Sequence, residues 1–343
     1  MEPIISADKG EKKFDIILLG RVCVDLNPTA EGYYKSTAEV DTFNRYLGGS
    51  PANIAVGMAR FGKKVGFIGK VSNDQLGDFV VNYFKNEGID VSHVTRAQNG
   101  ENLGLAITEI LSETQSSILM YRNGVADLAL SPEDVDEEYI AQAGMLLISG
   151  TALSASPSRE AAFKAAAIAK RLGVTVIFDV DYRPQNWRST DEIAVYYSLL
   201  AERSDMILCS REEMSLTEGL CMPGNDDDGR SAAYWMGKSA KLMVIKHGKS
   251  GSNAFLADGR KYLVKPFPVK LLKSFGGGDG YAAAFLTSLI NGKSVEDALS
   301  LASACAAMLV ASKSCSQDMP TMEALCAFET DAVAAHGRMV SEL

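Results

Sequence analysis

The chain has 343 residues, and 34 Lys and Arg against 43 Asp and Glu give it a formal net charge of −9 at pH 7. Hydrophobic residues make up 47% and charged residues 22%, which is ordinary for a globular protein and excludes disorder over most of the length. The acidic balance argues against a nucleic-acid-binding protein, because such a protein normally presents a basic face.

The N-terminal segment 1–13 mixes charged, small and apolar residues, which predicts a flexible tail before a folded domain at 14–343. It shows no basic stretch followed by an apolar run, as a signal peptide would. The most apolar stretch, 299–311, is shorter than the roughly 20 residues that a membrane span needs. The six cysteines form no CxxC pair. We therefore expect a cytoplasmic protein without a disulfide framework.

Short runs rich in Val, Ile, Leu and Met recur along the chain and predict strands buried on both faces. The clearest helix signal is Ser156-Pro157, an N-cap followed by a proline at the first helical position, with Gly173 at the other end. This alternation predicts an α/β fold with a mostly parallel central sheet between two layers of helices. The strand runs are 14–20, 65–71, 145–150, 174–180, 206–210 and 242–248, and further helices start near Pro51, Asn73, Asp191, Gly229 and Asp279.

Two segments interrupt the alternation of strands and helices. Residues 30–47 mix polar and aromatic residues without a helical period. Residues 103–124 contain two strand-like runs around the turn-prone sequence SETQSS. We expect these two segments to form a small β-sheet, separate from the main sheet and placed over it as a lid.

Three consecutive glycines at 276–278 precede Asp279 and a helix that ends near Gly292. Without Cβ atoms, backbone N–H groups at a helix N-terminus can converge on an anion. A carboxylate at the same place can take a proton from a hydroxyl group that attacks a phosphoryl group. From this segment alone, an ordinary N-cap after a glycine-rich turn explains the pattern equally well.

The glycine run matches neither of two common nucleotide-binding motifs. A G-x-G-x-x-G fingerprint read from Gly276 would need a glycine where Tyr281 stands. The first glycine of a GxxxxGK[ST] loop would fall on Met243 or Thr287. The sequence therefore disfavours a nicotinamide-dependent dehydrogenase, and any phosphate chemistry must use another architecture.

The glycine run with Asp279 resembles the second signature of the ribokinase-like (PfkB-type) carbohydrate kinases, whose usual form is GAGD. A first signature, GGSPANIA at 48–55, stands far upstream and in the right order. The run GRVCVDLN, which contains Asp25, completes the pattern, and the resemblance covers roughly 14–328. It implies a three-layer α/β/α kinase fold with a small β-sheet lid, and an enzyme that uses ATP and Mg²⁺ to phosphorylate an alcohol.

The resemblance also implies roles for individual residues. Asp279 would be the catalytic base, and Gly276, Gly277 and Gly278 would form the anion hole for the phosphate. Substrate contacts would come from Asp25, Gly48, Gly49 and Asn53, which suits a polyol because its hydroxyls are bound by carboxylate, amide and backbone groups. As an alternative, Asn53 simply helps to start a helix after Pro51. Nucleotide contacts would come from Lys246, Gly248, Gly251 and Ser274, and Glu213 would help to place Mg²⁺ through water.

Two arginines are further candidates for binding an anion. Arg183 follows a strand of the predicted parallel sheet, at the edge where open α/β sheets bind ligands. Its guanidinium could grip either a substrate carboxylate or the ATP phosphates, or it could be a surface group paired with Asp181. Arg122, at the end of a predicted lid strand, could reach down to the substrate.

The sequence departs from the family pattern at three positions. The extra glycine in GGGD should loosen the turn without removing an N–H donor. Ser210 replaces the asparagine of the NxxE segment, which weakens that contact with Mg²⁺ and phosphate. Lys273 stands where the family often has an aspartate tied to a monovalent-cation site, which argues against activation by potassium.

Longer strings, among them ITEILSETQSSILMYR and DVDYRPQNW, are similar to those of family members that phosphorylate a keto-deoxy sugar acid. Phosphorylation of 2-dehydro-3-deoxygluconate is the first alternative within the family, and fructokinase and ribokinase activities are the next. A non-catalytic sugar-binding regulator on the same fold is a different class, and the intact Asp279 with its glycines disfavours it. Exposed edges of the predicted lid sheet favour a homodimer that pairs through the lid.

Overall fold

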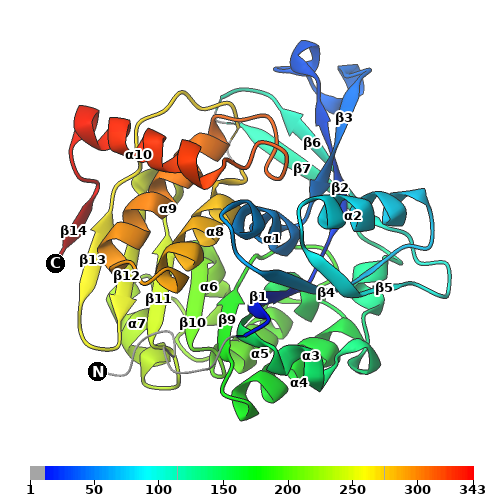
Figure 1. Cartoon of the computed structure of the whole chain (residues 1–343), viewed down its shortest axis with the longest axis horizontal. Coiled ribbons are helices and arrows are strands. Elements are labelled where there is room, and N and C mark those ends of the chain that lie inside the picture. The colour runs from blue at the N-terminus through cyan, green and yellow to red at the C-terminus, as the bar shows by residue number, and fades with distance from the viewer. Residues whose placement is uncertain (1–11, 114, 274) are drawn as a thin grey trace.

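The computed structural model describes residues 12–113, 115–273 and 275–343 (Figure 1). The strands of this part of the chain form one ten-stranded sheet and one four-stranded sheet. The predicted N-terminal tail lies almost wholly outside the described residues. Within them, no helix is long and apolar enough to cross a membrane, and all six cysteines are unpaired.

The main sheet has the strand order β14-β13-β12-β11-β10-β9-β8-β1-β4-β5. From β5 to β11 every neighbouring pair is parallel, while β12, β13 and β14 add an antiparallel edge. All six predicted strand runs form strands of this sheet, whereas β5 and the antiparallel edge were not predicted. The strands are β1 (Phe14–Leu19), β4 (Val65–Val71), β5 (Asp90–Arg96), β8 (Ala143–Ser149), β9 (Thr175–Asp179), β10 (Met206–Ser210), β11 (Leu242–Lys246), β12 (Ser252–Leu256), β13 (Lys261–Val264) and β14 (Val340–Glu342).

Helices cover both faces of the main sheet and enclose one apolar core on each side. Side chains alternate along each strand, so Ile16 and Leu18 of β1 enter one core while Ile17 and Leu19 enter the other. The predicted three-layer α/β/α fold is confirmed. On the first face lie α1 (Ser50–Arg60), α2 (Gln75–Asn86), α8 (Gly277–Ile290), α9 (Val295–Val310) and α10 (Met322–His336). On the second lie α3 (Glu137–Ala141), α4 (Ser158–Arg171), α5 (Thr190–Ala201), α6 (Arg211–Thr217) and α7 (Asp228–Met236).

Some boundaries differ from the sequence prediction. Helix α4 begins at Ser158, and Pro157 is its N-cap rather than its first helical residue. The apolar stretch at 299–311 belongs to the buried helix α9. Helix α8 is buried all round from 280 to 289 because it packs between the sheet, α1 and α9, which explains its continuous apolar sequence.

The small sheet stands out from the main body at the upper right of Figure 1. Its order is β3-β2-β6-β7, in which β2 and β6 pair in parallel and the outer pairs are antiparallel. Residues 103–124 supply two of its strands as expected. Only the end of 30–47 is a strand, and β2, with Asp25, is central rather than part of the main sheet. Its strands are β2 (Cys23–Pro28), β3 (Phe43–Gly48), β6 (Gly104–Ile110) and β7 (Ser116–Tyr121).

The strand order reverses at β1, which has β4 on one side and β8 on the other. In open α/β sheets, the carboxyl ends of the strands beside such a reversal flank a crevice that binds ligands. The chain leaves β1 at this edge and passes through Arg21 directly into β2 of the small sheet. The fold therefore places the base of the small sheet beside the crevice.

Candidate active site

A cavity of about 50 Å³ lies at this edge, between the small sheet and the first turns of α1 and α8. The small sheet contributes Asp25, Thr108 and several apolar side chains, and the main body contributes the other polar groups. Its lining residues are Arg21, Asp25, Gly49, Ser50, Asn53, Ala106, Thr108, Ile118, Met120, Arg183, Phe275, Gly276, Asp279 and Cys315.

Asp279 points into this cavity from the first turn of α8, and Asn53 of α1 donates a hydrogen bond of 2.7 Å from Nδ2 to its Oδ2. Burial raises the pKa of Asp279 to about 6, and the negative charge of Asp181 adds to the rise. The hydrogen bond from Asn53 and the charge of Arg183 act in the opposite direction. Asp279 is therefore mainly ionised at neutral pH, with a pKa close enough to accept a proton efficiently.

The three glycines shape the start of α8. Gly276 is the N-cap and has a φ of 87°, and a Cβ atom there would overlap Sγ of Cys315. No side chain caps the helix. Within the described residues, no acceptor outside α8 takes the N–H of Gly276, Gly277 or Gly278. These groups and the helix dipole can therefore bind an anion beside Asp279.

Of the first-signature residues, Gly49 and Asn53 line the cavity, whereas Gly48 is not among its lining residues. Gly48 ends β3 opposite Cys23 of β2, and a Cβ on Gly48 would overlap the Asp25 carboxylate. Gly49 is the N-cap of α1 with a φ of 100°, a conformation that suits glycine. Burial raises the pKa of Asp25, although the charge of Arg21 opposes this. The structure thus brings Asp25, Gly49 and Asn53 together around one cavity.

Two guanidinium groups face the cavity. Arg183 forms an ion pair with Asp181, with 2.9 Å between Nη2 and Oδ1, yet it also lines the cavity. Arg21 donates from Nη1 to Sγ of Cys23 at 3.1 Å. In the described part of the chain, Nε of each arginine is buried without a hydrogen-bond partner. Both groups therefore have capacity to bind an anionic ligand.

Arg122 is not among the cavity-lining residues, contrary to the expectation that it would reach the substrate. It is buried, with its Nη2 2.6 Å from Oδ2 of Asp127 and 2.8 Å from the carbonyl oxygen of Thr151. Its Nη1 donates to Oγ of Ser154 at 3.1 Å. Together these partners hold the guanidinium in the protein interior, away from the cavity. Arg21, which the sequence analysis missed, lines the cavity instead. Its position directly after β1 could have identified it, because Arg183 was chosen for lying at the same edge of the sheet.

The residues expected to contact a nucleotide follow β10 and β11. Lys246 ends β11, and its Nζ lies 3.5 Å from the place where a Cβ on Gly278 would be. Burial alone would lower the pKa of Lys246, but the charges of Asp179 and Glu213 raise it overall. Gly248 and Gly251, with φ of 55° and 93°, form the turn between β11 and β12. Ser274 lies outside the described residues.

Glu213 is fixed in place by the start of α6. Its Oε2 accepts a hydrogen bond of 2.6 Å from the N–H of Ser210, and its Oε1 accepts one of 2.9 Å from the N–H of Tyr182. Oγ of Ser210 accepts from the N–H of Glu213 at 3.2 Å and completes a capping box. The serine that departs from the family pattern therefore orients this glutamate.

Asp179, at the end of β9, is an acidic residue of the site that the sequence analysis missed. Burial and the charges of Asp181 and Glu213 raise its pKa to about 7, while Lys246 opposes the rise. Its Oδ2 accepts a hydrogen bond of 2.9 Å from Oγ of Ser50. Within the described residues, no three His, Cys, Asp or Glu side chains converge as a metal site. A cation bound mainly by other ligands would nevertheless reduce the electrostatic repulsion between these neighbouring carboxylates.

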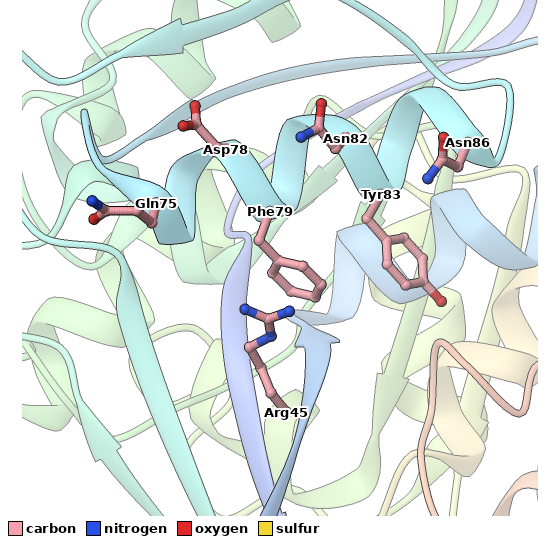
Figure 2. Close-up of a pocket in the computed structure, with 7 residues that line it drawn as sticks. All are labelled: Arg45, Gln75, Asp78, Phe79, Asn82, Tyr83 and Asn86. Atoms are coloured by element: carbon pink, nitrogen blue, oxygen red, sulfur yellow. The ribbon is translucent and has the colours of Figure 1, made fainter.

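A larger hollow of about 450 Å³ lies outside this site, between α2 and β3 (Figure 2). Arg45 of β3 points at the ring of Phe79 on α2, with 4.0 Å from the guanidinium carbon to the ring centroid. The carboxylate in this hollow, Asp78, pairs with Arg96 at 2.6 Å. The hollow shares no lining residue with the cavity that contains Asp279, so it is not the candidate active site. It marks a contact between the small sheet and the main body.

Comparison with known proteins agrees with this geometry. The model of the pfkB family of carbohydrate kinases matches residues 13–322. This chain belongs to that family. A 5-dehydro-2-deoxygluconokinase from Clostridium perfringens is 58% identical over 331 residues, which cover 96% of this chain and 97% of that relative.

Two solved structures share the fold. A PfkB protein from Polaromonas sp. JS666 is 26% identical, with a TM-score of 0.79 over 92% of this chain and 99% of that one. A ribokinase II from E. coli, solved in complex with ATP and Mg²⁺, is 21% identical, with a TM-score of 0.81 over 93% of this chain and 99% of that one. At this level of identity the second structure supports the fold alone.

Proposed function

We propose that this carbohydrate kinase transfers the γ-phosphoryl group of ATP to the 6-hydroxyl of 5-dehydro-2-deoxy-D-gluconate, a step of myo-inositol catabolism. The observation that carries the proposal is Asp279, a cavity-lining carboxylate with a pKa of about 6 beside the open N–H groups of α8. The 58% identity to a 5-dehydro-2-deoxygluconokinase over nearly the whole chain supports this substrate.

In the proposed reaction, Asp279 acts as the general base. The 6-hydroxyl oxygen attacks the γ-phosphorus, and the bond from this phosphorus to the bridging oxygen of ADP breaks. The hydroxyl proton passes to the Asp279 carboxylate. Asn53 holds that carboxylate through the 2.7 Å hydrogen bond and favours its ionised form. A general base of this kind typically contributes about 10²–10⁴-fold to the rate.

The transferring phosphoryl group carries negative charge that must be balanced within the site. The N–H groups of Gly276, Gly277 and Gly278 would bind its oxygens at the positive end of the α8 dipole. Lys246 lies next to the same first turn and would neutralise the phosphates further. The turn at Gly248 and Gly251 would accommodate the rest of the nucleotide. Positioning and charge neutralisation supply most of the catalysis in reactions of this class.

The two arginines suit a substrate that is an acid. Arg21 and Arg183 line the cavity with unpartnered Nε groups, and a guanidinium can bind a carboxylate with two hydrogen bonds. Asp25, Gly48 and Gly49 would bind the hydroxyl groups. We therefore assign the arginines to the sugar-acid carboxylate. A 2-dehydro-3-deoxygluconate or a neutral fructose would use the same cavity with different contacts.

The carboxylates near Lys246 fit a magnesium ion that is bound mainly through water and phosphate. Both Glu213 oxygens accept backbone N–H groups, and the pKa of Asp179 is raised to about 7 partly by neighbouring acids. Mg²⁺ usually keeps several waters and takes only one or two protein carboxylates. Asp179 and Glu213 would hold it through such waters, and the ion would neutralise charge on the ATP phosphates.

The small sheet would act as a lid. The small sheet forms one side of the cavity, so its movement would open and close the site around a sugar acid. Closure would exclude water and suppress hydrolysis of ATP. The outer strand β7 exposes Leu119 and Tyr121, at 52% and 59%, which supports a homodimer formed through the lids. The six unpaired cysteines suit a reducing cytoplasm.

The decisive experiment measures release of ADP from ATP and Mg²⁺ with three acceptors. These are 5-dehydro-2-deoxygluconate, 2-dehydro-3-deoxygluconate and fructose, with Asp279→Asn as the inactive control. We expect the highest kcat/KM for the first. A higher value for either other acceptor would overturn the substrate assignment. No acceptor-dependent release with any of them would overturn the kinase proposal and favour a sugar-binding regulator.

A further inference from the structure

Lys273 is a fully buried lysine on the segment that leads into α8, and burial lowers the pKa of its amine. Its Nζ donates to the carbonyl oxygen of Leu309 at 2.7 Å, and lies 3.4 Å from the carbonyl oxygen of Ser314 and 3.5 Å from Oγ of Ser312. These partners are neutral, and no carboxylate among the described residues lies within ion-pair distance of it. Burying a charge without an opposite charge is costly, so this arrangement calls for an explanation.

The oxygen atoms around Lys273 are the kind that bind a small cation. Carbonyl and hydroxyl oxygens are typical ligands of hard cations, and an ammonium group offers three donors to satisfy them. Leu309 lies in the last turn of α9, and Ser312 and Ser314 follow that helix directly. The ammonium therefore sits at the C-terminus of α9, where the helix dipole is negative.

The other side of the ammonium faces the anion hole. Nζ lies 3.7 Å from the position that a Cβ on Gly276 would occupy, so it is next to the backbone that starts α8. Without a positive charge here, the carbonyl oxygens at the end of α9 would stand beside the N–H groups that are to bind the phosphate. The ammonium separates the two helix ends and adds its own positive charge beneath the anion hole.

We infer that the Lys273 ammonium is a tethered monovalent cation that holds the anion hole of α8 in place and makes this kinase independent of potassium. This inference rests on the proposed function for its catalytic consequence. The family resemblance places an aspartate and a monovalent-cation site at this position. The ammonium occupies the oxygen cluster in this chain, so these residues do not leave a site for a separate ion. Lys273 is a positioning residue, because it acts through the backbone at Gly276.

The test compares wild type with two variants. The assay starts in potassium-free buffer that contains tetramethylammonium chloride, and KCl then replaces this salt stepwise at constant ionic strength. Wild-type kcat should change less than about twofold across the titration. Lys273→Met removes the charge and should lower kcat by about 10- to 100-fold without recovery in KCl. Lys273→Asp places a carboxylate beside the carbonyl oxygens, as in the family pattern. Without potassium this variant should lose a similar amount of activity, and it should regain much of that activity as potassium binds.

Binding and stability provide readouts that do not depend on turnover. Lys273→Asp should bind the non-hydrolysable ATP analogue AMP-PNP more tightly, and melt at a higher temperature, when potassium is present. Lys293→Asp makes the same charge change at an exposed site beyond α8 and should show neither response. Circular dichroism and gel filtration establish that each variant is folded.

The outcomes distinguish this inference from the proposed function. A wild-type kcat that rises more than about tenfold with potassium would overturn the inference, even if no Lys273 variant folds. A folded Lys273→Met with wild-type kcat would also overturn it. If wild type phosphorylates no sugar acid, the proposed function fails. The inference is then judged by the effects of potassium on AMP-PNP binding and melting of Lys273→Asp, and their absence would overturn it.

Discussion

Asn53 and Asp279 lie 226 positions apart in the chain, and a hydrogen bond of 2.7 Å joins Nδ2 of the first to Oδ2 of the second. This bond connects the first turns of α1 and α8, which carry the two sequence signatures. The helices approach closely because Gly57 of α1 packs against Ala283 of α8, where a Cβ on the glycine would lie only 2.7 Å from the alanine Cβ. The packing of two small residues thus places the amide beside the carboxylate.

Replacing Asp279 with asparagine should abolish most turnover and leave nucleotide binding intact. The amide keeps the shape of the side chain but cannot accept the hydroxyl proton. We expect kcat to fall by at least about 10²–10⁴-fold, measured in a coupled assay, with AMP-PNP binding measured by calorimetry. Asp191→Asn, an exposed change on α5, is the matched control. Near wild-type kcat in Asp279→Asn would refute the role as base.

The pH dependence of the reaction should report the ionisation of Asp279. Its pKa is raised to about 6, and only the ionised form accepts a proton. We therefore expect kcat/KM to fall about tenfold per pH unit below this value, and to be independent of this group above it.

Two substitutions should shift the acidic limb of the pH profile, the part in which kcat/KM falls, in opposite directions. Asn53→Ala removes a hydrogen bond to the ionised form of Asp279 and should shift the limb to higher pH. Asp181→Asn removes a nearby negative charge and should shift it to lower pH. A limb that stays in place in both variants would show that another group controls the profile.

Gly276→Ala should destabilise the protein through both backbone strain and a clash. The φ of 87° costs a non-glycine residue about 1–2 kcal/mol, and the new Cβ overlaps Sγ of Cys315. Gly292→Ala is the matched control, because its φ is 74° and no atom lies within 4 Å of the added Cβ. Urea unfolding should show a larger loss for Gly276→Ala than for Gly292→Ala. Adding Cys315→Ala should recover part of the difference, and no recovery would exclude the clash.

The three arginines should respond differently to replacement by alanine. Arg21→Ala and Arg183→Ala should each raise the KM for the sugar acid about tenfold or more, with a smaller effect on the KM for ATP, because they line the cavity. Arg122→Ala leaves the buried Asp127 without its partner and should lower the free energy of unfolding by about 3–5 kcal/mol. Steady-state kinetics and urea unfolding separate the two effects. An Arg122→Ala enzyme of normal stability with a raised sugar KM would return Arg122 to the substrate site.

Arg45→Ala should loosen the small sheet. The cation–π contact with Phe79 joins β3 to α2 and is worth about 0.5–1 kcal/mol at an exposed site. Its loss should favour the open lid by about two- to fivefold, which we expect to appear as a higher ratio of ATP hydrolysis to sugar phosphorylation. Arg338→Ala, at an arginine whose side chain is 81% exposed, is the control. An unchanged ratio would show that this contact does not hold the lid.

The sequence predicted the main sheet well because strands buried on both faces have nearly continuous apolar sequences. It did not predict β5, the short helices α3 and α6, or the elements β12, β13, β14 and α10 at or beside the antiparallel edge. These elements have weaker patterns because part of their surface faces solvent; Leu325, for example, is the buried residue of α10. The extent of the small sheet was only partly predicted, since its central pairing of β2 with β6 joins segments far apart in the chain.

The sequence by itself determined the six strands from β11 to β4 of the main sheet, the family and the position of Asp279 after three glycines, because each depends on local composition or on short motifs. Only the tertiary structure decided that Arg21 rather than Arg122 lines the cavity, and that Lys273 lies between two helix ends. It also decided the raised pKa of Asp279, which depends on burial and on Asp181 across the site. These properties arise from distances between residues remote in the chain, and no local pattern records such distances.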